Sequence, residues 1–381
     1  MLVLKRLFCN WEESDMVEWK SIGEIIKRKR NKAKSLDITP PVYAVTNDRG
    51  FVLSAILHDF TIYSDDTSNY SVVEHNDFAY NPSRLNIGSI SYFKGYDKGL
   101  ISPMYVVFHA DESIIIPEYL YVVLKSEGVK NKIESLKEVG ARFRFDFSRW
   151  NLIQIPIPSK SEQERIVSIL DTFTSSIENL KEQIKERRKQ YEYYRNQLLD
   201  LEGKEGVKMK MSNFCILKAG KSIKAEDIKE FQDEINIYPC FGGNGIRGYV
   251  SYYSHDGEYP IIGRQGALCG CVNWAKGKFY ATEHAVVAKG IGEVSQRFLF
   301  KLFDGANLNQ YKTQGAQPGL SVTKLNELFF KIPSLTEQER IVDILDLFEA
   351  SIANLEAQLK QREKQYEYYR NQLLDFKKKE K

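Results

Sequence analysis

The chain has 381 residues, which corresponds to about two and a half domains of ordinary size. Apolar residues make up 43% and charged residues 28% of the chain, a balance that excludes a disordered protein. The formal net charge is only +3, so any nucleic-acid surface must be local, and no segment approaches the roughly 18 apolar residues that a membrane span needs.

The first predicted domain covers residues 1–158 and contains short β-type runs between turn residues. Runs such as Pro41–Val45, Phe51–Leu53, Ser89–Phe93 and Met104–Phe108 are rich in β-branched and aromatic residues. Helical stretches are fewer, with one expected near 117–138. This pattern predicts a compact α+β domain with a mixed sheet.

A long helix is predicted next, within residues 159–203. It has no glycine or proline between 160 and 199, and it begins just after a proline. Apolar residues recur at alternating steps of four and three, which is the seam of a coiled coil. The seam residues are Ile166, Leu170, Phe173, Ile177, Leu180 and Ile184. A helix of 39 residues would be about 58 Å long.

The second predicted domain covers residues 204–333 and has the same α+β character. Its β-type runs are Gly248–Tyr253, Tyr259–Gly263, Lys278–Thr282 and His284–Ala288, with a helix near 293–303. The glycines at 243, 245 and 248 formally match a dinucleotide-binding fingerprint. A strand rather than a helix is expected to follow them, so a hairpin turn is the better interpretation.

A second long helix is predicted within residues 334–381, and it repeats the first. Residues 162–200 and 337–375 are identical at 29 of 39 positions at a constant offset of 175, which indicates a duplication. The corresponding seam residues are Ile341, Leu345, Phe348, Ile352, Leu355 and Leu359. Both seams skip at an arginine, Arg187 and Arg362, which either packs across the seam or marks a solvated interruption.

The duplication predicts an α+β fold with pseudo-twofold symmetry. Two similar globular domains with mixed β-sheets would be separated by two long antiparallel coiled-coil helices. The alternative is a pair of amphipathic helices that lie on separate cores. A weaker correspondence between the two domains, at an offset of 180, aligns Arg84 with Arg264.

No motif in the sequence predicts a catalytic site, a metal or a cofactor. Asn81-Pro-Ser-Arg and Phe241-Gly-Gly-Asn-Gly are faintly similar to the catalytic tetrapeptide and cofactor loop of amino methyltransferases, but key residues and the following helix are missing. Cys269-Gly-Cys271 has no second ligand pair at the spacing of a zinc site. Five cysteines, an odd and sparse number, favour a reducing, cytoplasmic location.

Basic and amide side chains in turns are the candidates for ligand contact. Arg and Gln read guanine and adenine edges, while Lys and Ser position phosphates, so as a set they favour a nucleic acid as the ligand. The candidates are Asn81, Ser83, Arg84, Arg142, Arg144, Lys221, Lys224, Asn244, Arg247, Arg264, Gln265, Gln314 and Gln317. For any single residue, a solvated charged turn is an equally good interpretation.

Taken together, the chain resembles the specificity subunit of type I restriction–modification enzymes. The helices that begin Glu-Gln-Glu-Arg-Ile-Val and end Gln-Tyr-Glu-Tyr-Tyr-Arg carry the resemblance, and so do several motifs between them. These motifs are Asp77–Ile90, Gly99–Val107, Lys221–Asp227, Phe241–Gly248, Ile262–Leu268 and Tyr280–His284.

The resemblance implies a subunit that is not itself an enzyme. Each of two target-recognition domains would read one half of a split, asymmetric site in double-stranded DNA, and the paired helices would set the unread gap. The partners implied are two modification subunits, which methylate adenine N6 using S-adenosylmethionine, and ATP-driven translocase and endonuclease subunits. Two alternatives stay open: a self-sufficient adenine methyltransferase, and a scaffold that joins proteins without touching DNA.

Overall fold

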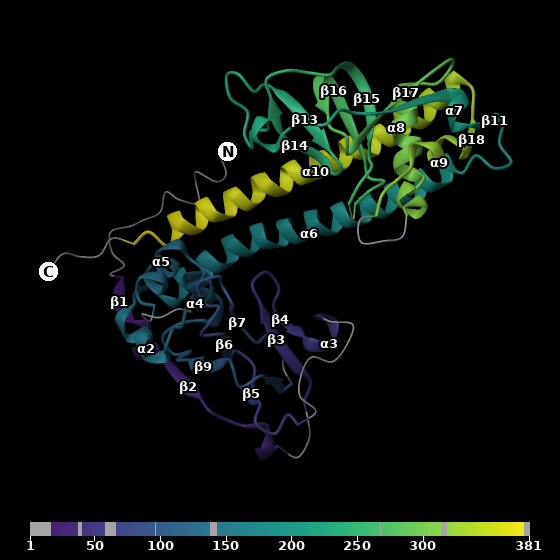
Figure 1. Cartoon of the computed structure of the whole chain (residues 1–381). Helices are drawn as coiled ribbons and strands as arrows, with labels where there is room; N and C mark the ends of the chain where they lie inside the picture. The colour runs from purple at the N-terminus through teal and green to yellow at the C-terminus, as the bar shows by residue number, and fades with distance from the viewer. Residues whose placement is uncertain are drawn as a thin grey trace, which may run out of the picture. The chain divides into compact units, whose positions relative to one another are not determined.

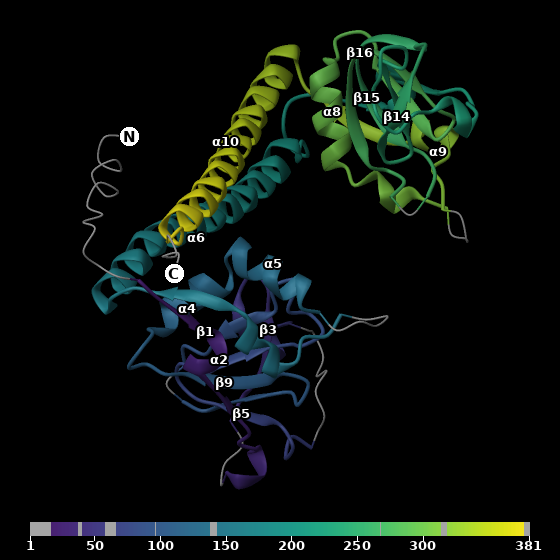
Figure 2. The ribbon, with the colours of Figure 1, turned by 90° about the vertical axis from the view of Figure 1, so that its left-hand side faces the viewer.

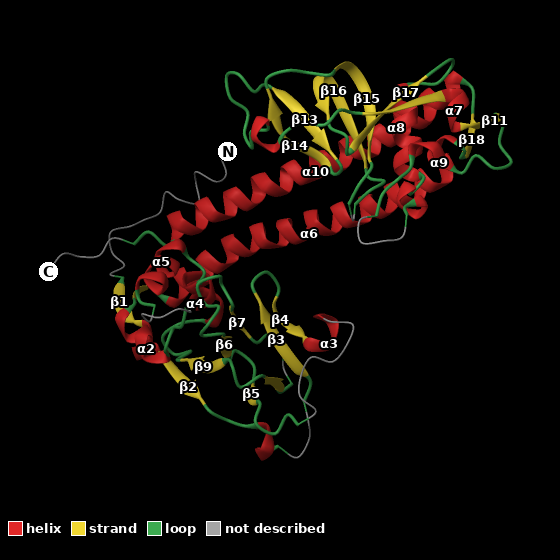
Figure 3. Cartoon of the chain, in the orientation of Figure 1, coloured by secondary structure: helices red, strands yellow, loops and turns green. Residues whose placement is uncertain are grey.

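The computed structural model describes residues 17–36, 40–57, 66–95, 97–137, 143–266, 268–313 and 318–376. The chain divides into two compact units. Unit 1 contains residues 1–179 and 359–381, and unit 2 contains residues 180–358 (Figure 1). Each unit therefore combines one globular segment with part of each long helix. Both units mix helices with β-sheets (Figure 3), as predicted.

The described strands of unit 1 are short. They are β1 (Glu18–Ser21), β2 (Ile26–Lys29), β3 (Val42–Thr46), β4 (Gly50–Leu53), β5 (Ser71–Val73), β6 (Phe78–Tyr80), β7 (Ile90–Tyr92), β8 (Gly99–Ile101), β9 (Val106–Ala110) and β10 (Gln154–Ile157). They form two four-stranded sheets, β2-β9-β6-β7 and β4-β3-β8-β5, and the pair β1-β10. Because β3 and β8 run parallel and their neighbours antiparallel, the second sheet is mixed.

Short helices complete the globular part of unit 1. They are α2 (Ile22–Ile25), α3 (Ser54–Leu57), α4 (Pro117–Leu124) and α5 (Glu127–Ser135), with 3-10 turns η1 (Ala33–Ser35) and η2 (Phe147–Leu152). A proline begins α4, where its missing N–H costs no hydrogen bond. The Ser126 side chain caps α5 by accepting from the N–H of Val129.

Aromatic side chains fill the main core of unit 1. The ring of the fully buried Trp150 lies 4.8 Å from that of Phe145 and 5.8 Å from that of Tyr80, centroid to centroid. The same cluster includes Leu373 and Phe376 from the other end of the chain. Unit 1 is thus built from two segments that are distant in sequence.

Unit 2 contains one large sheet. Its described strands are β11 (Val207–Lys210), β12 (Cys215–Ala219), β13 (Tyr238–Gly242), β14 (Gly245–Val250), β15 (His255–Gly263), β16 (Val272–Ala281), β17 (Ala285–Gly290) and β18 (Phe329–Ile332). Six of them form a sheet in the order β12-β17-β15-β16-β13-β14, in which β13 and β16 are parallel, while β11 pairs with β18. The helical elements are α7 (Met211–Phe214), α8 (Gln296–Gly305) and α9 (Val322–Asn326), with η3 (Ala225–Asp227) and η4 (Leu308–Tyr311).

The two long helices are α6 (Lys160–Leu199) and α10 (Leu335–Leu373). In unit 1 the first half of α6 packs on the end of α10 (Figure 2), where the rings of Phe173 and Tyr369 are 5.2 Å apart. In unit 2 the end of α6 packs on the first half of α10, and the rings of Tyr194 and Phe348 are 5.3 Å apart. In each unit the helices therefore run antiparallel. The offset of 175 relates the two contacts, because Phe173 corresponds to Phe348 and Tyr194 corresponds to Tyr369. Among the described residues, no helix is long and apolar enough to cross a bilayer.

A buried glutamine near the start of each long helix attaches it to the globular segment. The Gln163 side chain accepts from the N–H of Ile116 (2.9 Å) and donates to the carbonyls of Ile114 (3.1 Å) and Pro158 (3.0 Å). In unit 2, 175 residues later, Gln338 accepts from the N–H of Ser295 (2.9 Å). It donates to the carbonyls of Glu293 and Pro333, both at 2.9 Å. Ile116 and Ser295, which cap α4 and α8, are thus structural equivalents.

Candidate nucleic-acid interface

The ends of several strands of unit 2 converge on one cluster of loops. The N–H of Arg264, just after β15, donates to the carbonyl of His284 in the β16–β17 connection (2.8 Å). The N–H of Lys221, just after β12, donates to the carbonyl of Ala281 at the end of β16 (3.0 Å). The β13–β14 hairpin also reaches this place, and its two-residue loop is Gly243–Asn244. The predicted hairpin interpretation of the glycine-rich motif is therefore correct.

Glycine is required where the hairpin meets the end of β15. A Cβ atom at Gly243 would lie 2.7 Å from the carbonyl oxygen of Gln265, and one at Gly263 would collide with the carbonyl of Gly243. Gly245 adopts a φ of +89°, which side-chain-bearing residues rarely adopt. The glycines therefore serve close backbone packing, which holds the side chains of the neighbouring loops in place.

Most of the predicted contact residues of unit 2 point toward solvent. Lys221, Lys224, Asn244, Arg247 and Gln265 are exposed, and Arg264 is half-buried. Arg264 and Gln265 line a cavity of about 280 Å³ together with Thr313 and Gly319. Lys224 forms an exposed ion pair with Glu226 (3.3 Å). Gln314 and Gln317 lie outside the described residues.

Two further polar residues of this loop cluster were not among the predicted contacts. Glu283 Oε2 and His284 Nδ1 are enclosed atoms that have no hydrogen-bond partner in the described structure. Burial raises the pKa of the nearby Cys240 thiol to about 11, Arg247 opposes this shift, and Glu283 adds to it. Glu283 and Arg247 therefore both lie near Cys240. The other two atoms of this pair, Glu283 Oε1 and His284 Nε2, lie 3.6 Å apart on half-buried side chains, and a carboxylate and an imidazole are suited to hydrogen-bond base edges.

Unit 1 gathers its loops around a wider cavity of about 710 Å³. Asn47 from the β3–β4 hairpin, Arg84 from the loop after β6, and Ser102 and Tyr105 from the β8–β9 connection line it. Arg84 is exposed. Apolar side chains, among them Val42, Ile87 and Met104, share the lining with these polar residues.

The predicted contacts Asn81 and Ser83 form the turn that carries Arg84. Asn81 is buried, its Oδ1 accepts from the N–H of Ser83 (2.9 Å), and its Nδ2 contacts the sulfur of Met104 (3.7 Å). Ser83 itself is exposed. Asn81 thus shapes the loop and has little surface left for a ligand.

Arg144 is exposed on a loop that packs beside this turn, since the N–H of Phe145 donates to the carbonyl of Pro82 (3.0 Å). Burial raises the pKa of the neighbouring Tyr80 hydroxyl, while Arg28 and Arg144 lower it, so both arginines lie near this tyrosine. The predicted contact Arg142 lies outside the described residues.

The predicted seam positions of the long helices are all buried or half-buried. The buried ones are Ile166, Leu170, Phe173, Ile184, Ile341 and Leu345, and the half-buried ones are Ile177, Leu180, Phe348, Ile352, Leu355 and Leu359. The seam arginines pack across: the guanidinium of Arg187 lies 5.9 Å from the ring centroid of Phe348. Its duplicate Arg362 lies 5.7 Å from that of Phe173. Of the two interpretations of these arginines, packing across the seam is the one observed.

The described part of the chain contains neither a candidate metal site nor a disulfide bond. No group of three His, Cys, Asp or Glu residues there is placed to hold a metal ion. Cys215, Cys240, Cys269 and Cys271 are free thiols, and Cys271 is exposed.

Comparison with known proteins identifies the family of this chain. The family model described as the type I restriction modification DNA specificity domain matches residues 11–187 and again residues 204–364. The EcoprrI specificity subunit of Escherichia coli is 46% identical over 209 residues, which cover 52% of this chain and 52% of that protein. This chain thus matches about half the length of that relative. The EcoR124I/EcoR124II specificity subunit, also from Escherichia coli, is 27% identical over 96% of this chain and 95% of that protein.

A solved structure shares the fold over nearly the full length. The crystal structure of the S subunit of a type I restriction-modification system from M. genitalium aligns with a TM-score of 0.60 at 15% identity, and the alignment covers 97% of this chain and 99% of that one. The two family matches divide the chain as its internal duplication does. This chain belongs to the type I restriction modification DNA specificity domain family, and it carries two copies of that domain.

Proposed function

We propose that this chain is a DNA-binding specificity subunit of a type I restriction–modification complex. Its target-recognition domains, residues 1–158 and 204–333, each read one half of a bipartite, asymmetric site. Residues 159–203 and 334–381 form the spacer helices between them. The observation that carries this proposal is the double match to a DNA specificity domain, with a cluster of polar loops in each matched copy. Because the two domains are linked, DNA binding by one makes DNA binding by the other intramolecular. Each domain therefore needs only modest affinity for DNA.

Side chains at the strand ends supply the reading chemistry. Arg264 and Gln265 offer the bidentate donors and acceptors that suit guanine and adenine edges, and Glu283 offers an acceptor for the amino group of cytosine. In unit 1, Arg84 lies beside the cavity and offers the same guanidinium donors. Lys221 and Lys224 are exposed, and Lys224 would exchange its surface ion pair with Glu226 for a phosphate. Phosphate contacts position the duplex without specifying sequence.

The chemistry on DNA belongs to partner subunits in this proposal. The matched relatives are named specificity subunits, and among the described residues of the two loop clusters no nucleophile is held by a base. Modification subunits would methylate adenine N6, and translocase and endonuclease subunits would cut unmodified DNA after ATP-driven movement. The target adenine must leave the base stack before it is methylated, and this is easier in a bound, bent duplex.

The test is to map adenine methylation in a host that carries this chain with its modification subunit. We expect one split motif, which disappears when the chain is deleted. Arg84→Ala and Arg264→Ala should each relax the sequence at one half-site and leave the other half-site strict. If either variant leaves methylation at every site unchanged, that arginine does not read DNA.

A purified chain separates the proposal from its two alternatives. The chain alone should transfer no methyl group and bind no S-adenosylmethionine, and it should gain methylation only with the modification subunit. Methylation by the chain alone would establish a self-sufficient methyltransferase. Failure to shift duplex DNA, with and without partner subunits, would favour a protein scaffold.

A further inference from the structure

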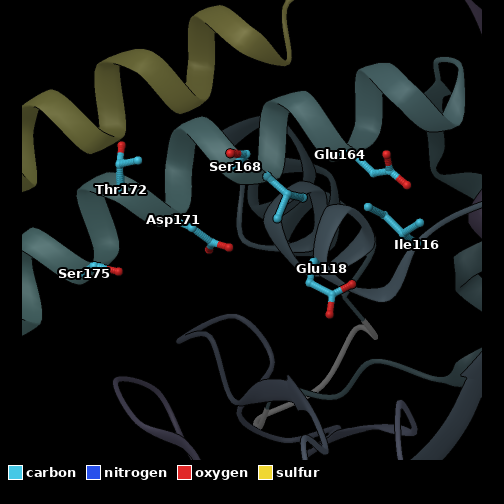
Figure 4. A pocket seen from close by; sticks show the side chains of 8 residues that line it. Ile116, Glu118, Glu164, Ser168, Asp171, Thr172 and Ser175 are labelled. Carbon is cyan, nitrogen blue, oxygen red and sulfur yellow. The ribbon is translucent and has the colours of Figure 1, made fainter.

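Unit 1 has a surface groove between α4 and α6 with a volume of about 570 Å³. Three carboxylates line it, Glu118 from α4 and Glu164 and Asp171 from α6, and we call it the acidic groove (Figure 4). Hydroxyl side chains continue the same face of α6, namely Ser168, Thr172 and Ser175. Because every charged residue in the lining is acidic, the groove suits a cation and repels a phosphate backbone.

The side chains around the acidic groove include a further acid, Glu178, as well as Lys94. Partial burial raises the pKa of Asp171, Lys94 opposes that shift, and Glu118 and Glu178 add to it. The hydroxyl of Tyr92 also lies against Glu118. Within the described ranges, none of Glu118, Glu164 and Asp171 forms an ion pair. A cation that entered here would meet several acceptors at once.

In unit 2, the place equivalent to the acidic groove is occupied by cationic side chains of the chain itself. Because the cap residues of α4 and α8 are equivalent, Glu118 corresponds to Arg297, and the offset of 175 pairs Asp171 with Asp346. In unit 2, Arg297 forms an ion pair with Asp346. The buried Lys301 adds a second contact, with its Nζ 2.9 Å from Asp346 Oδ1.

In unit 1 the first of these cations is replaced by an acid, and the second, Lys301, corresponds to the apolar Val122. The carboxylate on the long helix is retained in both copies. Unit 1 has therefore kept the acceptor and lost both internal donors.

We propose that the acidic groove is a docking site for an arginine or lysine side chain of a protein partner. This inference rests on the proposed function, in which modification subunits bind the chain. Unit 2 fills the equivalent place with its own Arg297 and Lys301, so Asp346 already has cationic partners, while the exposed Glu339 and Asp343 stay acidic. Two copies of one partner would then meet unequal surfaces, and the copy on unit 1 would be the more sensitive to salt.

The test uses the full chain with its modification subunit. Copies bound per chain are counted by native mass spectrometry, and affinity is measured at rising NaCl concentration. Glu118→Arg copies the unit 2 arrangement, so the new arginine should pair with Asp171, preserve the fold and close the groove. We expect one of two copies to bind about tenfold more weakly at low salt, and its salt dependence to flatten.

Matched variants make the outcome decisive. Glu164→Lys reverses a charge in the acidic groove, and Glu339→Lys makes the same change at the duplicate position of unit 2. We expect only the first to weaken one copy, with thermal melts unchanged in both. If Glu118→Arg and Glu164→Lys bind both copies like the unmodified chain, the acidic groove is not a docking site, while the proposed function stands. If the unmodified chain recruits no modification subunit, both proposals fail.

Discussion

The buried glutamines at the start of the long helices provide a quantitative test of how each helix is attached. Gln163→Ala would remove one acceptor and two donors, and would leave the N–H of Ile116 and the carbonyls of Ile114 and Pro158 without this partner. Each buried backbone group left unpaired costs about 1–3 kcal/mol. Partial hydration of the new cavity lowers the sum, so we expect unit 1 to lose about 3 kcal/mol.

Hydrogen exchange of the amide of Ile116 measures this loss directly, because Gln163 is its acceptor. A loss of about 3 kcal/mol corresponds to roughly hundredfold faster exchange. Gln163→Glu is the matched control. It keeps the acceptor but places a carboxylate against two carbonyls, so it should also destabilise unit 1 at neutral pH and recover as acid protonates it. Gln338→Ala should have the same effect on unit 2. Less than threefold faster exchange at Ile116 in Gln163→Ala would refute this account.

Three further predictions concern charge and thiol chemistry. Lys301→Met should destabilise unit 2 by about 3 kcal/mol in urea unfolding, because it removes the cation 2.6 Å from Glu349 in a buried place; an unchanged midpoint would contradict this. Burial, helped by two neighbouring cations, lowers the pKa of Lys125 to about 8. The folded state therefore binds fewer protons than the unfolded state between pH 8 and the ordinary lysine value, so the stability of unit 1 should rise with pH across that window. Lys125→Met should abolish the slope. In a Cys9→Ser background, Cys271 should react with a thiol reagent at neutral pH, while Cys215, whose pKa burial raises to about 12, should stay unmodified until unfolding; equal rates in a mass-spectrometric time course would count against it.

The long helices and the α+β class could be predicted because they depend on periodicity and duplication. Apolar residues at steps of four and three specify a seam, and identity at a fixed offset specifies two similar halves. The hairpin at Gly243–Asn244 was also predictable, since the turn chemistry is local.

Other features depend on contacts that no local pattern encodes. Gln163 reads as an ordinary residue of a helical first turn, and its three bonds exist only because the start of α4 and the end of β10 meet it. Glu283 and His284 became candidates only when their enclosed atoms were found without partners. The alignment of Arg84 with Arg264 is inexact for the same reason. Arg264 directly follows β15, whereas Arg84 lies four residues beyond β6, so the two loops differ in reach.

The packing of Leu373 and Phe376 in the main core of unit 1 has a consequence for folding during translation. A ribosome delivers residues 17–157 early, yet their apolar cluster stays incomplete until residues 373–376 have emerged. Unit 2 needs nothing beyond residue 358 and can close sooner. The globular part of unit 1 is thus translated first but completes its core last. Until then its exposed aromatic side chains can be bound by chaperones.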